Sequence, residues 1–222
     1  MAPGTNILSN CSKYEGAGTL WGAYNEDYCF SGGTSMSTPL VAAAAALVRQ
    51  ALMESRNVEV PSASLIKAIL MHTAVDLYPG QYGEVGKERG QELLKPGPNI
   101  DQGYGRVDVS KAIDSKVKFV DEKKGLATNE SKELKLPNGT KKVTLVYTDA
   151  PGATAAEKQL VNNLDITVVT ASGTMYVADS KVNNSEQIII PSGQRGLKLV
   201  VKGTSVPMGK DGRQPYSVVY SK

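Results

Sequence analysis

The spacing of apolar residues changes from a helical to an alternating pattern near residue 117, and this change constrains the fold more than any other feature. Beyond it lie four runs of β-branched and aromatic residues, each bounded by Gly, Pro, Asn or Asp. In order, the runs are KKVTLVYTD, LDITVVTASGTMYVAD, EQIIIPSGQRGLKLVVKG and PYSVVYS. Because no helical pattern separates them, they predict an antiparallel sandwich or barrel.

The chain before this point is helical in two places. Residues 40–53 contain no helix breaker, and Pro39 is tolerated in a first helical turn that begins at Ser37. The segment PSASLIKAILMHTAVDLY predicts a second helix, which Ser62 or Ser64 can cap. Helices first and strands afterwards indicate two domains.

Glycine, proline, asparagine and serine are frequent in residues 1–33 and 79–105, which we therefore expect to be loops. The N-terminal segment MAPGTNILSN has no basic region, long apolar core or cleavage site, so it does not have the features of a signal peptide. It starts within a turn-forming stretch. We interpret the chain as truncated, with Met1 either an internal residue or a misplaced start.

The composition narrows the classes of partner. The chain has 222 residues, 41% of them hydrophobic, and a net charge of +3, which is too mild to favour nucleic acid or an acidic membrane surface. No apolar run approaches the roughly 18–20 residues that a membrane helix needs. The longest candidate, residues 40–48, is mostly alanine and is typical of a buried helix. We therefore expect neither a nucleic-acid nor a membrane partner.

Two cysteines, Cys11 and Cys29, flank one loop. They are either two unrelated buried thiols or a disulfide that ties the loop leading to Ser35. The glycosylation pattern N-x-[ST] occurs at Asn10 and at three further positions, Asn129, Asn138 and Asn183. For a eukaryotic source, these features favour an extracellular or secretory location.

The segment SGGTSMSTPLV places Ser35 between a glycine pair and an alanine-rich helix. Unpaired N–H groups and the positive end of the helix dipole meet at such a position, which suits a nucleophilic hydroxyl and its oxyanion. The simpler interpretation is that Ser35 only caps the helix, as serines often do. Local physics alone leaves both interpretations open.

Four segments in order decide between them: APGTNILS, GTSMSTP, LIKAILMHTAVD and GYGRVDVSKAI. Together they resemble the subtilisin-like serine proteases (subtilases, peptidase family S8) around and after the nucleophile. The segments LVYTDAPGA, LVNNLDITV, VNNSEQIII and QPYSVVYS resemble the β-domain of the KP-43-like branch. The resemblance implies an α/β domain over residues 1–115, the C-terminal portion of a subtilisin-like fold. An all-β antiparallel, jelly-roll-like sandwich over residues 116–222 would follow it.

By this resemblance Ser35 is the nucleophile of a serine endopeptidase and its N–H is an oxyanion donor, with Thr34 and Met36 as positioning neighbours. The family's aspartate, histidine and oxyanion asparagine lie upstream, in segments resembling DTG and HGTHVAG, which this sequence does not contain. The one histidine, His72, falls where the family has no catalytic residue. We therefore expect a protein or peptide substrate, but no activity unless an upstream segment is supplied in cis or in trans.

Other assignments stay open. A Ser–Lys arrangement with Lys67 or Lys87 has no support from spacing. The family often binds calcium, for which Asp149, Asn162 and Asp165, together with Asn163, are weak candidates; capping of turns is the favoured role. The sequence has no cluster of cysteine and histidine residues that would suggest a zinc site, and we expect no cofactor. The alternative function is a non-catalytic binding or structural β-domain with a vestigial protease segment.

Overall fold

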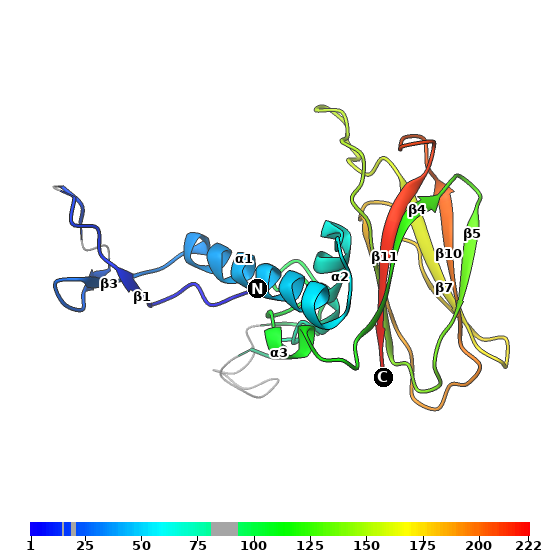
Figure 1. The fold of residues 1–222 in the computed structure, drawn as a ribbon, viewed down its shortest axis with the longest axis horizontal. Coiled ribbons are helices and arrows are strands. Elements are labelled where there is room, and N and C mark those ends of the chain that lie inside the picture. The colour runs from blue at the N-terminus through cyan, green and yellow to red at the C-terminus, as the bar shows by residue number, and fades with distance from the viewer. Residues whose placement is uncertain (15, 19–20, 81–92) are drawn as a thin grey trace. The chain divides into compact units, whose positions relative to one another are not determined.

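The computed structural model describes residues 1–14, 16–18, 21–80 and 93–222. The chain forms two compact units (Figure 1). Unit 1 comprises Met1–Leu47 and Ala74–Val109, and unit 2 comprises Val48–Thr73 and Ser110–Lys222. This division differs from the expected boundary at residue 115, because residues 48–73 pack with the β-rich part of the chain.

Unit 1 contains a small antiparallel sheet. Its strands β1 (Ile7–Asn10), β2 (Gly22–Ala23) and β3 (Tyr28–Ser31) lie in the order β1-β3-β2. The sheet falls within residues 1–33, where only loops were expected. Strands of two to four residues are too short to produce a visible alternation of apolar and polar residues.

The helix α1 (Thr34–Ser55) runs from unit 1 into unit 2. It begins three residues before the expected start at Ser37, so Pro39 lies in its second turn rather than its first. Pro39 has no N–H to donate to the carbonyl of Ser35, four residues earlier, and one helical hydrogen bond is therefore missing. The first turn of α1 is consequently less tightly bonded than the rest of the helix.

The side chains of α1 are more exposed than expected. Leu40, Val41 and Leu47 are 42%, 36% and 50% exposed, so the prediction of a buried helix over residues 40–48 is wrong for these side chains. Within the described residues, α1 is one helix that is long and apolar enough to cross a membrane, by length and composition. The core helix of a soluble protein meets the same criteria.

Unit 2 contains two four-stranded antiparallel sheets (Figure 1). The first has the order β4-β11-β6-β9, with strands β4 (Lys118–Leu126), β11 (Gln214–Ser221), β6 (Lys142–Val146) and β9 (Ser185–Ile189). The second has the order β5-β10-β7-β8, with strands β5 (Ser131–Lys135), β10 (Lys198–Ser205), β7 (Asn163–Val169) and β8 (Met175–Ala178). The fold is therefore α/β in its first part and β-rich in its second.

The two sheets share one core. Leu145 and Val218 from the first sheet pack with Leu164, Ile166 and Leu199 from the second, and each of these side chains is at most 1% exposed. Because successive residues of a strand point to opposite faces, the neighbours of Leu145 and Val218 along the chain point away from this core. The outer face of the first sheet thus carries apolar side chains of its own.

The helix α2 (Ala63–Thr73) covers that outer face. Leu65 and Ile69 of α2 pack with Val146 of β6 and Val219 of β11, and all four are at most 2% exposed. The end of α1 and the short helix α3 (Val109–Ala112) contribute Val48, Leu52 and Ala112 to the same cluster. This second core explains why residues 48–73 belong to unit 2.

Candidate active site

Ser35 is the second residue of α1 and is exposed to solvent. Within the described residues, its hydroxyl has no hydrogen-bond partner. The first N–H groups of a helix have no acceptor inside the helix, so the amide of Ser35 can donate to a ligand. The site therefore combines an unengaged hydroxyl with backbone donors.

The two neighbours of Ser35 have backbone roles. The carbonyl of Thr34 accepts a hydrogen bond from the Thr38 hydroxyl at 2.8 Å. The amide of Met36 donates to the carbonyl of Gly33 at 3.1 Å. These bonds fix the backbone of the first turn, and the side chains of both neighbours leave the Ser35 hydroxyl uncovered.

The N-terminal segment holds this turn from the other side. Gly33 donates its N–H to the carbonyl of Gly4 at 2.6 Å, and the Ser37 hydroxyl donates to the carbonyl of Ala2 at 3.0 Å. Gly33 has a φ of 135°, which side-chain-bearing residues rarely adopt. At Gly32, a Cβ atom would clash with the ring of Trp21. Both glycines are therefore required by the geometry before Ser35.

Cys11 and Cys29 form a disulfide in the structure, with Cα atoms 5.3 Å apart. Cys29 lies in β3 opposite Ser9 of β1, and the amide of Cys11 donates to the carbonyl of Asp27 at 2.7 Å. The bond therefore links the end of β1 to the strand that leads to the turn before Ser35. Of the two open alternatives, the geometry corresponds to the disulfide.

His72 is a core residue of unit 2. It is 2% exposed, with Nδ1 2.9 Å from the Thr144 hydroxyl and Nε2 2.9 Å from the Ser221 hydroxyl. Burial, with the charge of Lys142 as a smaller cause, lowers the pKa of His72 to about 3. A general base works best with a pKa near the working pH. His72 therefore has neither a free nitrogen nor the basicity for that role.

The lysine alternatives gain no geometric support. Lys67 Nζ donates to Asn184 Oδ1 at 3.4 Å, a contact within unit 2. Lys87 lies outside the described residues. In the described part of the chain, no lysine contacts the Ser35 hydroxyl.

Two of the weak calcium candidates, Asp149 and Asn162, bond nearby backbone groups. The Asp149 carboxylate accepts the backbone N–H groups of Ala150, Val161 and Asn162, each at 2.8 Å. The Asn162 side chain bonds the backbone of Met208 in both directions. The side-chain oxygens of Asp149 and Asn162 are thus engaged with backbone N–H groups, whereas the buried Oδ1 of Asn163 has no hydrogen-bond partner among the described residues.

Asp165 has partners of its own. Its carboxylate accepts hydrogen bonds from Asn163 Nδ2 at 3.1 Å and from the Thr204 hydroxyl, and Lys181 Nζ lies 3.9 Å away. Among the described residues, no group of three or more His, Cys, Asp or Glu is placed to hold a metal ion. Asp165 therefore has two hydrogen-bonding partners and one lysine near the limit of ion-pair distance.

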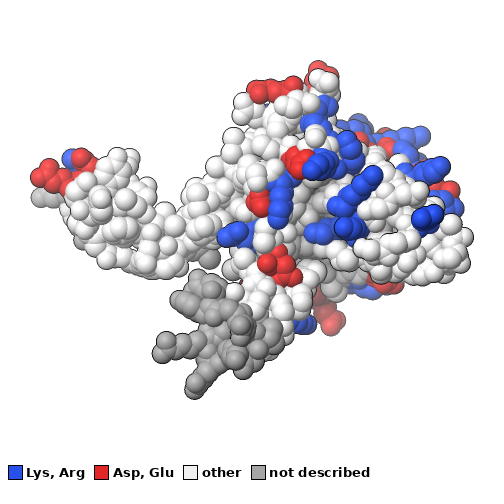
Figure 2. Space-filling view, turned by 90° about the horizontal axis from the view of Figure 1, so that it is seen from below, with Lys and Arg blue, Asp and Glu red and all other residues white. Residues whose placement is uncertain are grey.

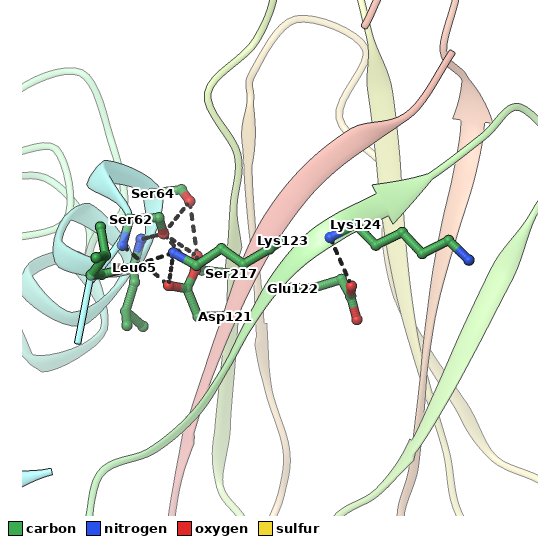
Figure 3. Close-up of polar contacts among 9 residues, drawn as sticks. Ser62, Ser64, Leu65, Asp121, Glu122, Lys123, Lys124 and Ser217 are labelled. Carbon is green, nitrogen blue, oxygen red and sulfur yellow. Dashed lines mark hydrogen bonds and ion pairs between the residues drawn. The ribbon is translucent and has the colours of Figure 1, made fainter. Parts of the chain in front are cut away.

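A polar cluster at the start of α2 was not found from the sequence. The Ser62 hydroxyl accepts the N–H of Leu65 at 3.0 Å, which makes Ser62, rather than Ser64, the cap of α2. Figure 3 shows Ser62, Ser64 and Ser217 gathered around the carboxylate of Asp121, with Lys123 beside it. The cluster joins α2 to β4 and β11.

The electrostatics of this cluster indicate a structural role. Burial disfavours the charged carboxylate, but hydrogen bonds from Lys123, Ser62 and Ser217 outweigh it and hold the pKa of Asp121 below its ordinary value. An ionised carboxylate of low pKa is a poor base towards a serine hydroxyl. The cluster therefore fixes α2 on the sheet and does not activate a nucleophile.

Comparison with known proteins shows which family the segment around Ser35 resembles. The chain is similar to two proteins of Dictyostelium discoideum. It is 27% identical to the serine protease/ABC transporter B family protein tagB over 85% of this chain, and 25% identical to tagD of the same description over 99%. The chain spans only 13% and 16% of the length of these relatives. The subtilase family model, Peptidase_S8, matches residues 1–105, which include Ser35. By this match, the first part of the chain, with its exposed serine at the start of α1, is similar to the subtilase family.

Proposed function

We propose that the chain is the C-terminal part of a subtilisin-like serine endopeptidase and that Ser35 is its nucleophile. The observation that carries this proposal is an exposed, unpartnered serine in the first turn of α1, within the segment that matches the subtilase family. The substrate class is protein or peptide. The serine protease descriptions of tagB and tagD support the same assignment.

In the proposed reaction, the Ser35 hydroxyl, the base and the Ser35 N–H each take part in a defined step. The Ser35 oxygen attacks the scissile carbonyl carbon, its proton passes to a base, and the carbonyl oxygen becomes an oxyanion that accepts the Ser35 N–H. Collapse of this intermediate breaks the C–N bond, the proton goes to the leaving amine, and an acyl ester remains on Ser35. Water then hydrolyses the ester and regenerates the hydroxyl.

The base must come from elsewhere. His72 is buried and bonded through both nitrogens, so the proposal assigns the base, its aspartate and the oxyanion asparagine to an upstream subtilase segment, in cis or in trans. Loss of the serine or histidine in subtilisin itself reduces turnover by roughly a millionfold. Without the upstream segment, the chain is therefore expected to be inactive.

The exposed apolar side chains of α1 support the proposal that a further segment packs against this helix. Leu40, Val41 and Leu47 are large apolar side chains that remain 36–50% exposed. Covering such a side chain stabilises a protein by about 1.5–3 kcal/mol if it is fully buried, and correspondingly less here. The upstream segment is the proposed cover, because in an α/β protein an apolar helix packs against a sheet.

For unit 2 we propose a jelly-roll domain of the KP-43-like branch. The strand orders β4-β11-β6-β9 and β5-β10-β7-β8 support it, because each sheet alternates strands from the beginning and the end of the domain. The alternative function is a non-catalytic binding or structural module that this domain provides. It is favoured if Ser35 proves inert when the upstream segment is present.

We also propose an extracellular or secretory location for a eukaryotic source. The disulfide between Cys11 and Cys29 supports it, because such bonds persist in oxidising compartments. The four N-x-[ST] sites support it as well. Glycan occupancy of Asn129 or Asn138 in the native protein, measured by glycopeptide mass spectrometry, would test the location.

Reconstitution tests the proposed activity. The full chain is refolded with a polypeptide encoded upstream that carries the family's Asp, His and Asn, and casein cleavage is measured. We expect cleavage from the mixture, none from either part alone, and none after Ser35→Ala. Ser192→Ala, a matched change at an exposed serine of unit 2, should retain full cleavage. Cleavage that survives Ser35→Ala would refute the assignment.

A further inference from the structure

A pocket of about 440 Å³ lies at the end of unit 2 where β11 terminates. Its lining includes Ser115, Lys116 and Lys118, with Tyr220 and Lys222. Strand pairing brings these segments together, because Tyr220 of β11 lies directly opposite Lys118 of β4. Residues that face each other across two strands have Cβ atoms about 5 Å apart.

The turn between β5 and β6 closes the third side. Pro137 and Thr140 of this turn line the pocket, and the Thr140 hydroxyl donates to the Pro137 carbonyl at 2.8 Å. The amide of Lys141 donates to the carbonyl of Ser221 at 2.8 Å, which fixes the turn to β11. The side chain of Lys222 lies over Gly139 of the same turn. The pocket walls are thus held by backbone bonds and strand register.

The pocket is strongly basic. Its lining contains three lysines, Lys116, Lys118 and Lys222, and no Asp or Glu. Lys116, Lys118, Lys141 and Lys222 form no ion pair in the described part of the chain. Figure 2 looks from below, towards the end where the chain terminates in Figure 1, and shows Lys and Arg atoms spread over unit 2.

A concave site with several like charges concentrates ions of opposite charge. Lysine ammonium groups bind phosphate as point charges. The Tyr220 hydroxyl has no hydrogen-bond partner among the described residues and can donate to an anion. A volume of about 440 Å³ lies within the range of small-molecule sites and exceeds what a simple inorganic ion fills.

We propose that this pocket binds a small polyanion that carries two or more phosphate or sulfate groups. Lys116, Lys118 and Lys222 supply the charge, and Tyr220 supplies a directed hydrogen bond. The site is independent of Ser35, because all of its residues belong to unit 2. Binding is therefore expected whether or not the protease site is complete.

The test is isothermal titration of the full chain with inorganic pyrophosphate and, separately, with a trisulfated heparin disaccharide, in 150 mM NaCl. We expect submillimolar binding of at least one probe. The double variant Lys116→Gln/Lys118→Gln should weaken it tenfold or more, and Tyr220→Phe several-fold. Preference for one probe identifies phosphate or sulfate as the natural group.

The matched control is Lys202→Gln, which removes an exposed lysine from β10 in the other sheet. It should change the affinity less than twofold, and circular dichroism should show all variants folded. Equal weakening by Lys202→Gln would mean unspecific charge attraction and would overturn the proposal. Absence of submillimolar binding of both probes would overturn it as well.

Discussion

His72 allows a specific prediction of how stability depends on pH, because it is the one histidine of the sequence and is almost fully buried. Its ordinary pKa of 6.5 is lowered to about 3, chiefly by burial and further by the charge of Lys142. The folded protein therefore keeps the ring neutral at pH values where the unfolded chain protonates it. Between pH 6.5 and 3, the unfolded state binds one proton more than the folded state.

The direction and size of the change in stability with pH follow from this difference in bound protons. The contribution of His72 to stability is fully present above pH 6.5 and is lost as the pH falls towards 3. Each pH unit in this window costs about 1.4 kcal/mol, so the loss between pH 6.5 and 4.5 is about 3 kcal/mol. His72→Gln keeps a hydrogen-bonding side chain at this position but cannot take up the proton. Its stability should therefore be less sensitive to acid by that amount.

Two measurements check this reasoning. NMR of protein labelled in histidine gives one ring signal, and the ring of the folded protein should remain neutral at pH 4.5. Urea unfolding followed by circular dichroism at pH 6.5 and 4.5 gives the difference between the wild type and His72→Gln. A ring that titrates between pH 6 and 7 in the folded protein would refute the argument, and so would equal acid sensitivity of the two proteins.

Three further predictions concern other parts of the fold. Asp121→Ala should lower the free energy of unfolding by about 3 kcal/mol, because buried hydroxyls and the start of α2 lose their acceptor. Lys123→Ala, at an exposed side chain, should lower it by less than about 1 kcal/mol. Equal losses for the two variants in urea titrations would contradict this prediction. Burial, with the charges of Asp165 and Asp179, raises the pKa of Glu186 to about 7, so its contribution to stability is greatest below pH 4.5 and falls by up to about 3 kcal/mol towards pH 7. Glu186→Gln should remove this decline, and an unchanged pH profile would refute it. Non-reducing peptide mapping should recover Cys11 linked to Cys29. The bond joins residues 18 positions apart and stabilises the fold by about 3 kcal/mol in the chain-entropy model. Two free thiols in protein from an oxidising compartment would contradict this prediction.

The strands that could be predicted from the sequence are those with an apolar face. β6, β7, β10 and β11 combine β-branched or aromatic residues with clear turns, and the structure contains all four. β4 and β5 were missed because KFVDEKKGL and SKELK consist mainly of charged residues. Their strand conformation comes from pairing with β11 and β10, which is a tertiary effect.

The residues of the candidate site also fall into those that local sequence predicts and those that only the structure reveals. Ser35 was predictable because its glycines, the helix start and the following alanines are all local. The burial of His72 was not, because its partners Thr144 and Ser221 lie 72 and 149 residues away along the chain. The Asp121 cluster depends likewise on Ser62 and Ser217, at separations of 59 and 96 residues. Local patterns predicted Ser35 as the candidate nucleophile, whereas contacts that cross the sheet required the structure.

The central claim is that Ser35 is a nucleophile that lacks its base in this chain. The most direct measurement is the intact mass of the 222-residue protein after incubation with a fluorophosphonate, followed by peptide mapping. Without the upstream segment we predict no adduct, because a hydroxyl without a base remains protonated at neutral pH. With the upstream segment we predict one adduct, on Ser35. Labelling of Ser35 in the isolated chain would contradict the account and would place an unrecognised base among its own residues.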